Sequence, residues 1–141
     1  MNKILITSLL SLSFWFPPSS SDAESVVVIG HPGLPKLDVT TIQKLYTGRS
    51  IEINGKSVTV VNVVPNNKTR KIFLEKFLAQ DEEKYLAYWT VRRFIGKGTP
   101  PKELGSNEDV IAFVQSHADA IGYISADESR LPAGLNVLNE M

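Results

Sequence analysis

The sequence has no cysteine, no excess of charge of either sign and no apolar run of the length that crosses a membrane. Without cysteine there is no disulfide, thiol nucleophile or thiolate metal site, which leaves His31 and His117 as the nitrogen ligands. Neither histidine has a carboxylate at ligand spacing, so we expect no metal and no cofactor. Because 15 basic residues balance 15 acidic ones, the chain has no broad positive field to hold nucleic acid.

Motifs of catalytic sites are missing as well. The serines show no nucleophile-elbow pattern, and no glycine-rich phosphate loop occurs. Asp81, Glu82 and Glu83 are adjacent carboxylates, but they stand where a helix begins, and there the helix dipole favours negative charge. We therefore predict that the chain is not an enzyme.

The first 23 residues predict a secretory signal peptide. A short positive head is followed by a nearly unbroken apolar run over residues 4–16 and by a polar stretch. Ser21 and Ala23 are the small residues of a cleavage site. A membrane anchor would need about 20 apolar residues. We expect cleavage after Ala23, a periplasmic location, and one α/β domain over residues 24–141.

Strands and helices are expected to alternate in this domain. Continuous β-branched runs indicate strands buried on both faces, and Asp38, Asp81 and Ser106 are expected helix caps. Asn54-Gly55 predicts a tight hairpin turn. The predicted strands cover residues 26–29, 51–53, 58–64, 120–124 and 135–138. Four helices are predicted. The first covers residues 39–46, the second covers residues 67–79, the third follows Asp81, and the fourth covers residues 108–117. No strand is predicted between the second, third and fourth helices.

The apolar spacing also predicts which helix faces are buried. Phe73, Leu74, Phe77 and Leu78 share one stripe of the second helix. In the helix after Asp81, Leu86 and Trp89 are expected to face inward. The whole arrangement predicts a small layered domain in which helices cover a sheet.

Residues 65–70 combine the groups that bind an oxyanion. Asn66, Asn67, Lys68, Thr69 and Arg70 place two amides, one hydroxyl and two cations where a strand ends and a helix begins. Unpaired backbone N–H groups and the positive end of the helix dipole lie at the same point. Ligands of open α/β sheets also bind at the carboxyl ends of strands. The alternative is that an asparagine caps the helix while Lys68 and Arg70 are solvated.

Five short motifs occur in order over residues 26–125. After the first strand comes a helix that ends in an aromatic residue and a glycine. The motifs are 42–48, Asn67-Lys68-Thr69 with Phe73, Trp89 with Phe94 and Gly96, Pro100-Pro101, and Ala120-Ile121-Gly122-Tyr123. In this order the motifs resemble one lobe of the phosphate-binding proteins of ABC transporters, a family of type 2 periplasmic binding proteins (PBP). The resemblance implies a single PBP-like lobe with a mixed, mostly parallel sheet flanked by helices.

The resemblance also identifies two departures from the family. In the family, serine, glycine and threonine in the strand-to-helix turn, with an arginine six residues before the threonine, clasp the phosphate. Here Thr69 matches the threonine, Asn67 and Lys68 replace the serine and glycine, and Val63 stands at the arginine position. A bidentate donor is therefore missing.

The second departure is length. Family members close two lobes on the ligand, whereas residues 24–141 make one lobe. Two hypotheses follow. The chain is an exported domain that binds phosphate or a similar oxyanion for ABC-type uptake or sensing, with a permease as partner. Alternatively it is an orphan lobe that binds a periplasmic protein, or pairs with a copy of itself as a homodimer, without binding solute.

Overall fold

The computed structural model describes residues 13, 25–126 and 131–141. Apart from Ser13, the predicted signal peptide lies outside the described residues. Within them, no helix is long and apolar enough to cross a membrane. The elements follow in the order β1 (Val26–Gly30), α1 (Val39–Tyr46), β2 (Glu52–Ile53), β3 (Lys56–Ser57), β4 (Thr59–Val63), α2 (Lys68–Phe73), η1 (Leu74–Leu78), α3 (Glu82–Phe94), β5 (Lys102–Leu104), α4 (Asn107–Ser116), β6 (Ala120–Ser125) and β7 (Asn136–Glu140).

Five strands form one sheet in the order β5-β4-β6-β1-β7. β4 pairs in parallel with both β5 and β6, whereas β1 pairs antiparallel with β6 and with β7. Four of the five strands therefore run in one direction, and β1 runs against them. The expectation of a mixed, mostly parallel sheet flanked by helices is confirmed. β4, β6 and β1 are the three central strands. Their apolar runs are continuous because helices cover both faces of the sheet.

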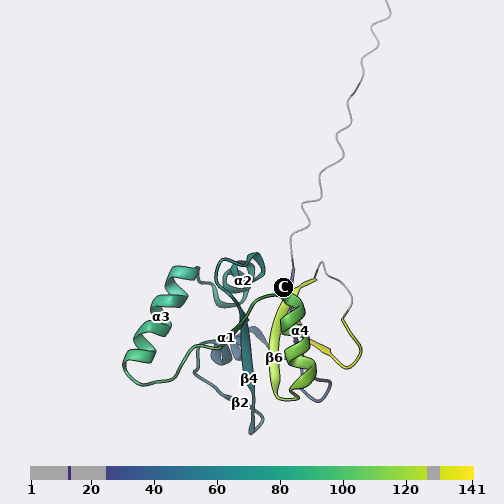
Figure 1. Cartoon of the computed structure of the whole chain (residues 1–141), viewed down its shortest axis with the longest axis horizontal. Helices are drawn as coiled ribbons and strands as arrows, with labels where there is room; N and C mark the ends of the chain where they lie inside the picture. The colour runs from purple at the N-terminus through teal and green to yellow at the C-terminus, as the bar shows by residue number, and fades with distance from the viewer. Residues whose placement is uncertain (1–12, 14–24, 127–130) are drawn as a thin grey trace, which may run out of the picture.

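Helices cover both faces of this sheet (Figure 1). On one face α4 packs its buried Val110 and Val114 against β6. On the other face the rings of Tyr46, Phe73 and Tyr123 form a cluster that joins α1 and α2 to β6. Figure 1 shows α4 in front of β6, whereas α3 stands at one side of the molecule.

The Ala120-Ile121-Gly122-Tyr123 motif serves both faces. A Cβ atom on Gly122 would lie 2.5 Å from Cγ1 of Val110, so the glycine lets α4 approach β6 closely. Tyr123 points to the other face, where its ring stacks on Phe73 with 3.9 Å between the ring centroids. Its hydroxyl reaches β4, where it accepts a hydrogen bond from the backbone N–H of Val63.

Local signals predicted several elements correctly. Helix α1 begins after the Asp38 cap and ends at Tyr46, as expected, with its C-cap at Thr47. Asn54 and Gly55 have φ angles of 49° and 78° and connect β2 to β3, as the turn signal indicates. The buried stripe of the second helix is confirmed, although its second half is the π-helical segment η1.

Two expectations were wrong. A strand, β5, lies between α3 and α4, where none was predicted, because its pairing with β4 supplies the order that its own sequence lacks. Leu86 does not face inward. Its side chain is 47% exposed, and Tyr85 and Trp89 form the buried side of α3. Residues four apart on a helix share a face, so Trp89 pairs with Tyr85 in the core.

Candidate functional site

The connection from β4 to α2 is a tight turn at the carboxyl end of β4. Pro65 and Asn66 are its central residues, and the N–H of Asn67 donates to the carbonyl of Val64 at 3.3 Å. Asn66 has a φ of 69°, a left-handed conformation that asparagine tolerates better than most residues. The turn places the first residue of α2 directly beyond the carboxyl end of a central strand.

Asn67 is the N-cap of α2. Its Oδ1 accepts a hydrogen bond from the N–H of Thr69 at 2.8 Å, which satisfies one of the N–H groups that a helix start leaves without an intrahelical partner. The alternative interpretation of the sequence included an asparagine that caps this helix, and Asn67 is that cap. The cap uses Oδ1 of Asn67 and the N–H of Thr69, so the Asn67 amide nitrogen and the other N–H groups of the first turn are the donors that could face an anion.

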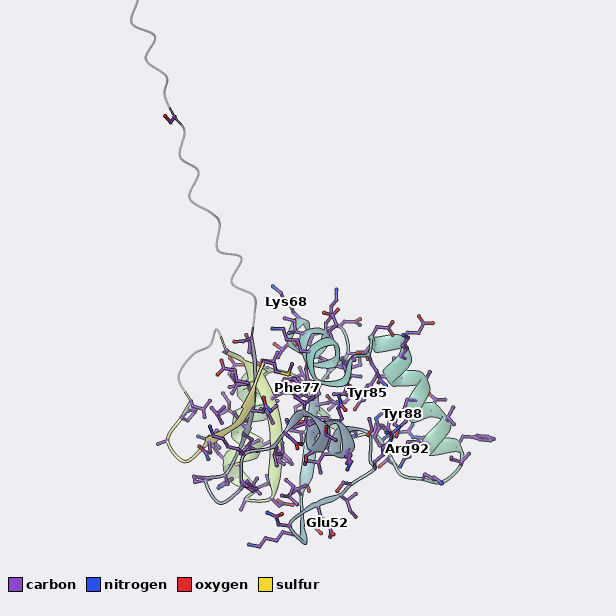
Figure 2. The ribbon with its side chains drawn as sticks, turned by 180° about the vertical axis from the view of Figure 1, so that it is seen from behind. Glu52, Lys68, Phe77, Tyr85, Tyr88 and Arg92 are labelled. Carbon is purple, nitrogen blue, oxygen red and sulfur yellow. The ribbon has the colours of Figure 1, made fainter. Side chains whose placement is uncertain are left out.

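An open pocket of about 350 Å³ lies at this helix start. Asn66, Asn67 and Lys68 line it together with two residues that the sequence did not suggest, Lys71 and Glu82. The structure thus brings three of the five predicted site residues to one pocket. Lys68 is exposed, and Figure 2 shows its side chain at the outer end of α2. Thr69 is buried and does not line this pocket.

Arg70 has a different environment from the one expected. Its side chain is 2% exposed, and its guanidinium binds Glu82 through Nε at 2.9 Å and Nη2 at 2.6 Å. Its Nη1 donates to Glu103 at 2.9 Å and to the carbonyl of Val63 at 3.0 Å. Arg70 is therefore not a solvated cation. It ties α2 to the end of β4, to α3 and to β5.

The ion pairs of Arg70 affect which anions the region can attract. One guanidinium is matched with the two carboxylates of Glu82 and Glu103, so the cluster has a formal charge of −1. An oxyanion gains nothing from Arg70 unless it displaces a carboxylate. The positive charge at the helix start comes from Lys68 and Lys71, which line the pocket there.

A buried hydrogen-bond network lies behind this site. Asn62, on β4, is 1% exposed, and its Nδ2 donates to the hydroxyl of Tyr85 at 3.0 Å. Its Oδ1 accepts from the hydroxyl of Tyr123 at 2.7 Å. The Tyr85 hydroxyl donates in turn to the carbonyl of Tyr46 at 3.0 Å. The network fixes β4, β6, α1 and α3 relative to one another, so the helix start rests on a rigid base.

The tyrosines of the network stay protonated at neutral pH. Burial raises the pKa of Tyr85 and of Tyr123, while hydrogen bonding and the nearby Arg70 act in the opposite direction. Burial also raises the pKa of Tyr46 well above its ordinary value, with a smaller contribution from the other two hydroxyls. These hydroxyls therefore act as neutral hydrogen-bonding groups. They do not supply an acid or a base.

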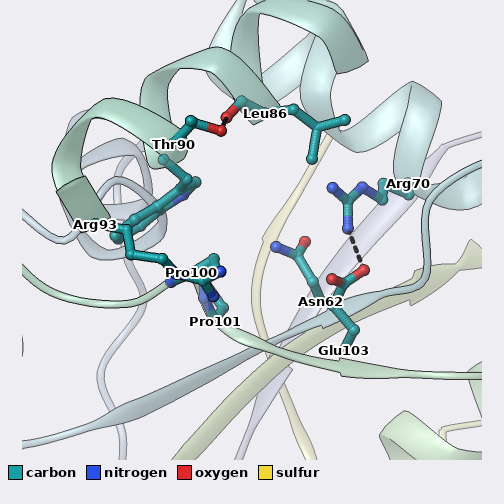
Figure 3. Close-up of a pocket in the computed structure, with 9 residues that line it drawn as sticks. Asn62, Arg70, Leu86, Thr90, Arg93, Pro100, Pro101 and Glu103 are labelled. Atoms are coloured by element: carbon teal, nitrogen blue, oxygen red, sulfur yellow. Dashed lines mark hydrogen bonds and ion pairs between the residues drawn. The ribbon is translucent and has the colours of Figure 1, made fainter.

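A second pocket, of about 190 Å³, lies on the other side of Arg70, between α3 and the ends of β4 and β5 (Figure 3). Asn62 and the Arg70–Glu103 ion pair lie at one end and Arg93 at the other, as Figure 3 shows. Leu86, Thr90 and the two prolines 100 and 101 line the rest. No local sequence signal predicts this pocket, since its residues come from distant segments.

The described part of the chain holds no group of three or more His, Asp or Glu side chains that could bind a metal ion. His31 and His117 lie in separate segments, in the connector after β1 and at the C-cap of α4. The chemistry that the site does offer is hydrogen bonding and positive charge toward an anion.

No protein-family model matches the sequence, and no curated protein matches it. The fold, however, matches solved structures. PstS from Borrelia burgdorferi superposes with a TM-score of 0.62 at 15% identity, over 82% of this chain and 47% of the PstS chain. A phosphate ABC transporter substrate-binding protein from Clostridium perfringens, solved with bound phosphate, gives 0.60 at 19% identity, over 82% of this chain and 44% of that one.

An ABC-type phosphate transport receptor from Vibrio cholerae gives a TM-score of 0.56 at 13% identity, again over 82% of this chain, and 46% of the receptor. The chain thus spans less than half the length of each of these proteins. It has the fold of a single lobe of the substrate-binding proteins of phosphate ABC transporters, which confirms the fold expected from the sequence motifs.

Proposed function

We propose that this chain is a phosphate-type binding domain, not an enzyme, that holds phosphate or a similar small oxyanion at the start of α2. The observation that carries the proposal is the position of that helix start. It follows the carboxyl end of β4 in a fold shared with phosphate-binding proteins, and a pocket with two lysines and two asparagines opens beside it. Helix starts at strand ends are general sites for anions.

Each predicted site residue has a distinct role in this proposal. The amides of Asn66 and Asn67 donate hydrogen bonds to the anion, and Lys68 supplies positive charge. Thr69 acts indirectly, because its side chain is buried and its N–H donates to the cap residue Asn67. Arg70 acts indirectly, since its contacts with Val63, Glu82 and Glu103 hold α2 in place. Lys71 is added to the set because it lines the same pocket.

We expect the affinity to be modest. A single lobe leaves one side of the anion in water, so its hydrogen bonds to the protein compete with hydrogen bonds to solvent. The bidentate arginine that the resemblance implies is also absent, since Val63 occupies that position and Arg70 is paired with carboxylates.

The proposal includes export and a partner. We expect the chain to be periplasmic after cleavage behind Ala23, to work with an ABC permease or a phosphate-sensing protein, and to pair with a second copy. The mass of the protein recovered from the periplasm tests the processing step. A chain that begins at Glu24 supports it, and a chain that retains Met1 in the membrane fraction refutes it.

The binding site is tested by calorimetric titration with inorganic phosphate of three proteins. In Asn67→Asp, the carboxylate still caps α2 but repels an anion, so we expect an unchanged melting temperature and no heat of binding. Ser106 caps α4 by accepting from the N–H of Asp109, and Ser106→Asp is therefore the matched control, expected to bind phosphate like the parent. Equal binding by all three proteins would show that the anion binds elsewhere.

A further inference from the structure

Helix α3 exposes an unusual amount of apolar surface. Among the residues that the structure describes, seven large hydrophobic side chains are exposed, and four of them lie on this helix or its C-cap. Their exposed fractions are 47% for Leu86, 59% for Val91, 91% for Phe94 and 55% for Ile95. Apolar side chains that gather on one surface mark an interaction site more often than scattered ones do.

The inner side of α3 is already used to hold the helix to the domain. Tyr85 and Trp89 are buried against the core. The hydroxyl of Tyr88 donates to the carbonyl of Thr47 at 2.7 Å, and Arg92 donates to the carbonyl of Gly48 at 3.2 Å. Figure 2 shows Tyr88 and Arg92 together where α3 meets the rest of the molecule. Val91, Phe94 and Ile95 are therefore not part of the domain's own packing, and Leu86 lies half-exposed in the wall of the pocket of about 190 Å³.

The outer face of α3 has the spacing of a two-helix interface. Glu83, Ala87, Thr90 and Phe94 are all exposed and are separated by four, three and four residues. This is the spacing that repeats along the seam of paired helices. Ala87 and Thr90, in the middle, are small and allow a second helix to come close. Leu86 and Val91 flank the seam.

The charges at the two ends of α3 are opposite. On its exposed side, Asp81 and Glu83 stand at its start and Arg93 and Lys97 stand at its end, whereas Glu82 pairs with Arg70 and Arg92 contacts Gly48 on the inner side. From Lys84 to Lys102 the sequence has no acidic residue. A surface that is acidic at one end and basic at the other is complementary to itself when two copies run antiparallel. The two helix dipoles are then antiparallel as well, which is favourable.

We propose that the outer face of α3 is a homodimer interface, in which α3 of a second copy packs antiparallel across it. The two-fold axis passes between Ala87 and Thr90, so that Ala87 of one copy faces Thr90 of the other. Glu83 then lies opposite Phe94 and beside Arg93 of the second copy. Such an interface is isologous, with every contact made twice. The dimer does not depend on the oxyanion site.

The distribution of charge favours a second copy over a membrane surface. Basic and apolar residues at the end of α3 are of the kind that bind anionic lipid. However, Glu83 lies on the same face as Phe94, so a membrane that covered the face would also press against a carboxylate. A second copy instead places Arg93 beside that carboxylate at both ends.

Charge reversal tests this arrangement by sedimentation velocity over a wide range of protein concentration. The parent chain is expected to dimerise, and Glu83→Arg and Arg93→Glu are each expected to weaken the dimer about tenfold or more, because two attractive pairs become repulsive. An equimolar mixture of these two variants, and the double variant that carries both changes, should dimerise again. Glu108→Arg is the matched control, since Glu108 is exposed in the first turn of α4, and it should dimerise like the parent.

Circular dichroism of each variant separates a lost interface from a lost fold. Three results would overturn the proposal: a parent that stays monomeric at every concentration, a parent dimer that both reversals leave unchanged, or a monomer that binds phosphatidylglycerol vesicles through Phe94. Recovery of the dimer in the mixture of the two variants would support it, since the rescue requires residue 83 of one copy to lie beside residue 93 of the other.

Discussion

Arg70 and Glu82 form a two-point ion pair in which Nε and Nη2 of the buried guanidinium meet the two carboxylate oxygens at 2.9 and 2.6 Å. The pair joins the first turn of α2 to the first turn of α3, twelve residues on. A second carboxylate, Glu103, binds Nη1 from β5, the strand that follows Pro100 and Pro101. The position of the candidate oxyanion site thus depends on an ion-pair cluster whose members come from α2, α3 and β5.

The first prediction concerns this ion pair. Glu82→Gln should lower the free energy of unfolding by about 1–3 kcal/mol, because it removes the charge that meets Arg70 at two points. Glu103→Gln should cost less, about 1 kcal/mol or below, because Glu103 makes one contact and is more exposed. Urea denaturation measures both. Equal small effects for the two variants would mean that the buried guanidinium does not need its two-point partner.

The second prediction concerns the face of α3 that is buried. Trp89→Ala should cost about 3–5 kcal/mol, as truncations of buried aromatic residues do. Trp89 is buried, and its ring lies against Gly48, where a Cβ atom would be 2.7 Å from Cη2 of the indole. Leu86→Ala is the comparison on the same helix and should change stability by about 0.5 kcal/mol or less. A large loss at Leu86 would contradict the exposed position described above.

The third prediction concerns Val63. The resemblance suggests that Val63→Arg would restore a phosphate ligand, but the structure makes a gain of binding unexpected. Val63 is fully buried, its N–H donates to Tyr123, and its carbonyl accepts from Arg70. A second guanidinium there would be buried beside the first, and we expect a loss of about 3–5 kcal/mol. Val63→Ile is the control. A folded Val63→Arg protein with tighter phosphate binding would contradict this prediction.

The fourth prediction is a loss of stability at alkaline pH. Burial raises the pKa of Tyr46, Tyr85 and Tyr123 above 10.0 in the folded chain. In the unfolded chain these hydroxyls ionise near pH 10, so above that pH the unfolded state binds fewer protons than the folded state. The free energy of unfolding is therefore at its full value below about pH 10 and falls above it, by up to about 1.4 kcal/mol per pH unit for each tyrosine.

Tyrosinate absorbance and far-ultraviolet circular dichroism, recorded in one alkaline titration, test this prediction. The three buried tyrosines should ionise only together with the loss of the folded signal. If their absorbance change is complete near pH 10 while the fold persists, the three hydroxyls are not protected by burial.

Elements with strong local signals could be predicted from the sequence. Asp38 and the apolar spacing after it were sufficient for α1, and Asn54-Gly55 for the β2–β3 turn, because capping and left-handed turn residues act over a few residues. The short β5 strand has no such signal. Lys102-Glu103-Leu104 has neither β-branched residues nor alternation, and it becomes a strand because β4 lies beside it.

The environment of the site residues was less predictable. Asn67 was placed correctly at the helix start, since capping is local. Arg70 looked like an exposed cation of the same turn, but its partners are twelve and thirty-three residues away. A spacing of three residues from Trp89 predicts that Leu86 is a core residue, whereas Tyr85, four residues from Trp89, occupies the core. Contacts between distant segments decide such cases, and spacing along one helix does not report them.

The central claim is that an oxyanion binds at the start of α2, and amide chemical shifts test it most directly. We expect inorganic phosphate to shift the backbone N–H signals of Asn67, Lys68 and Thr69 in a saturable way, and to leave the equivalent signals at the start of α4 unchanged. Chloride at equal ionic strength serves as the reference, because charge screening alone would move both helix starts. Phosphate that shifts neither start, or both equally, would contradict the account.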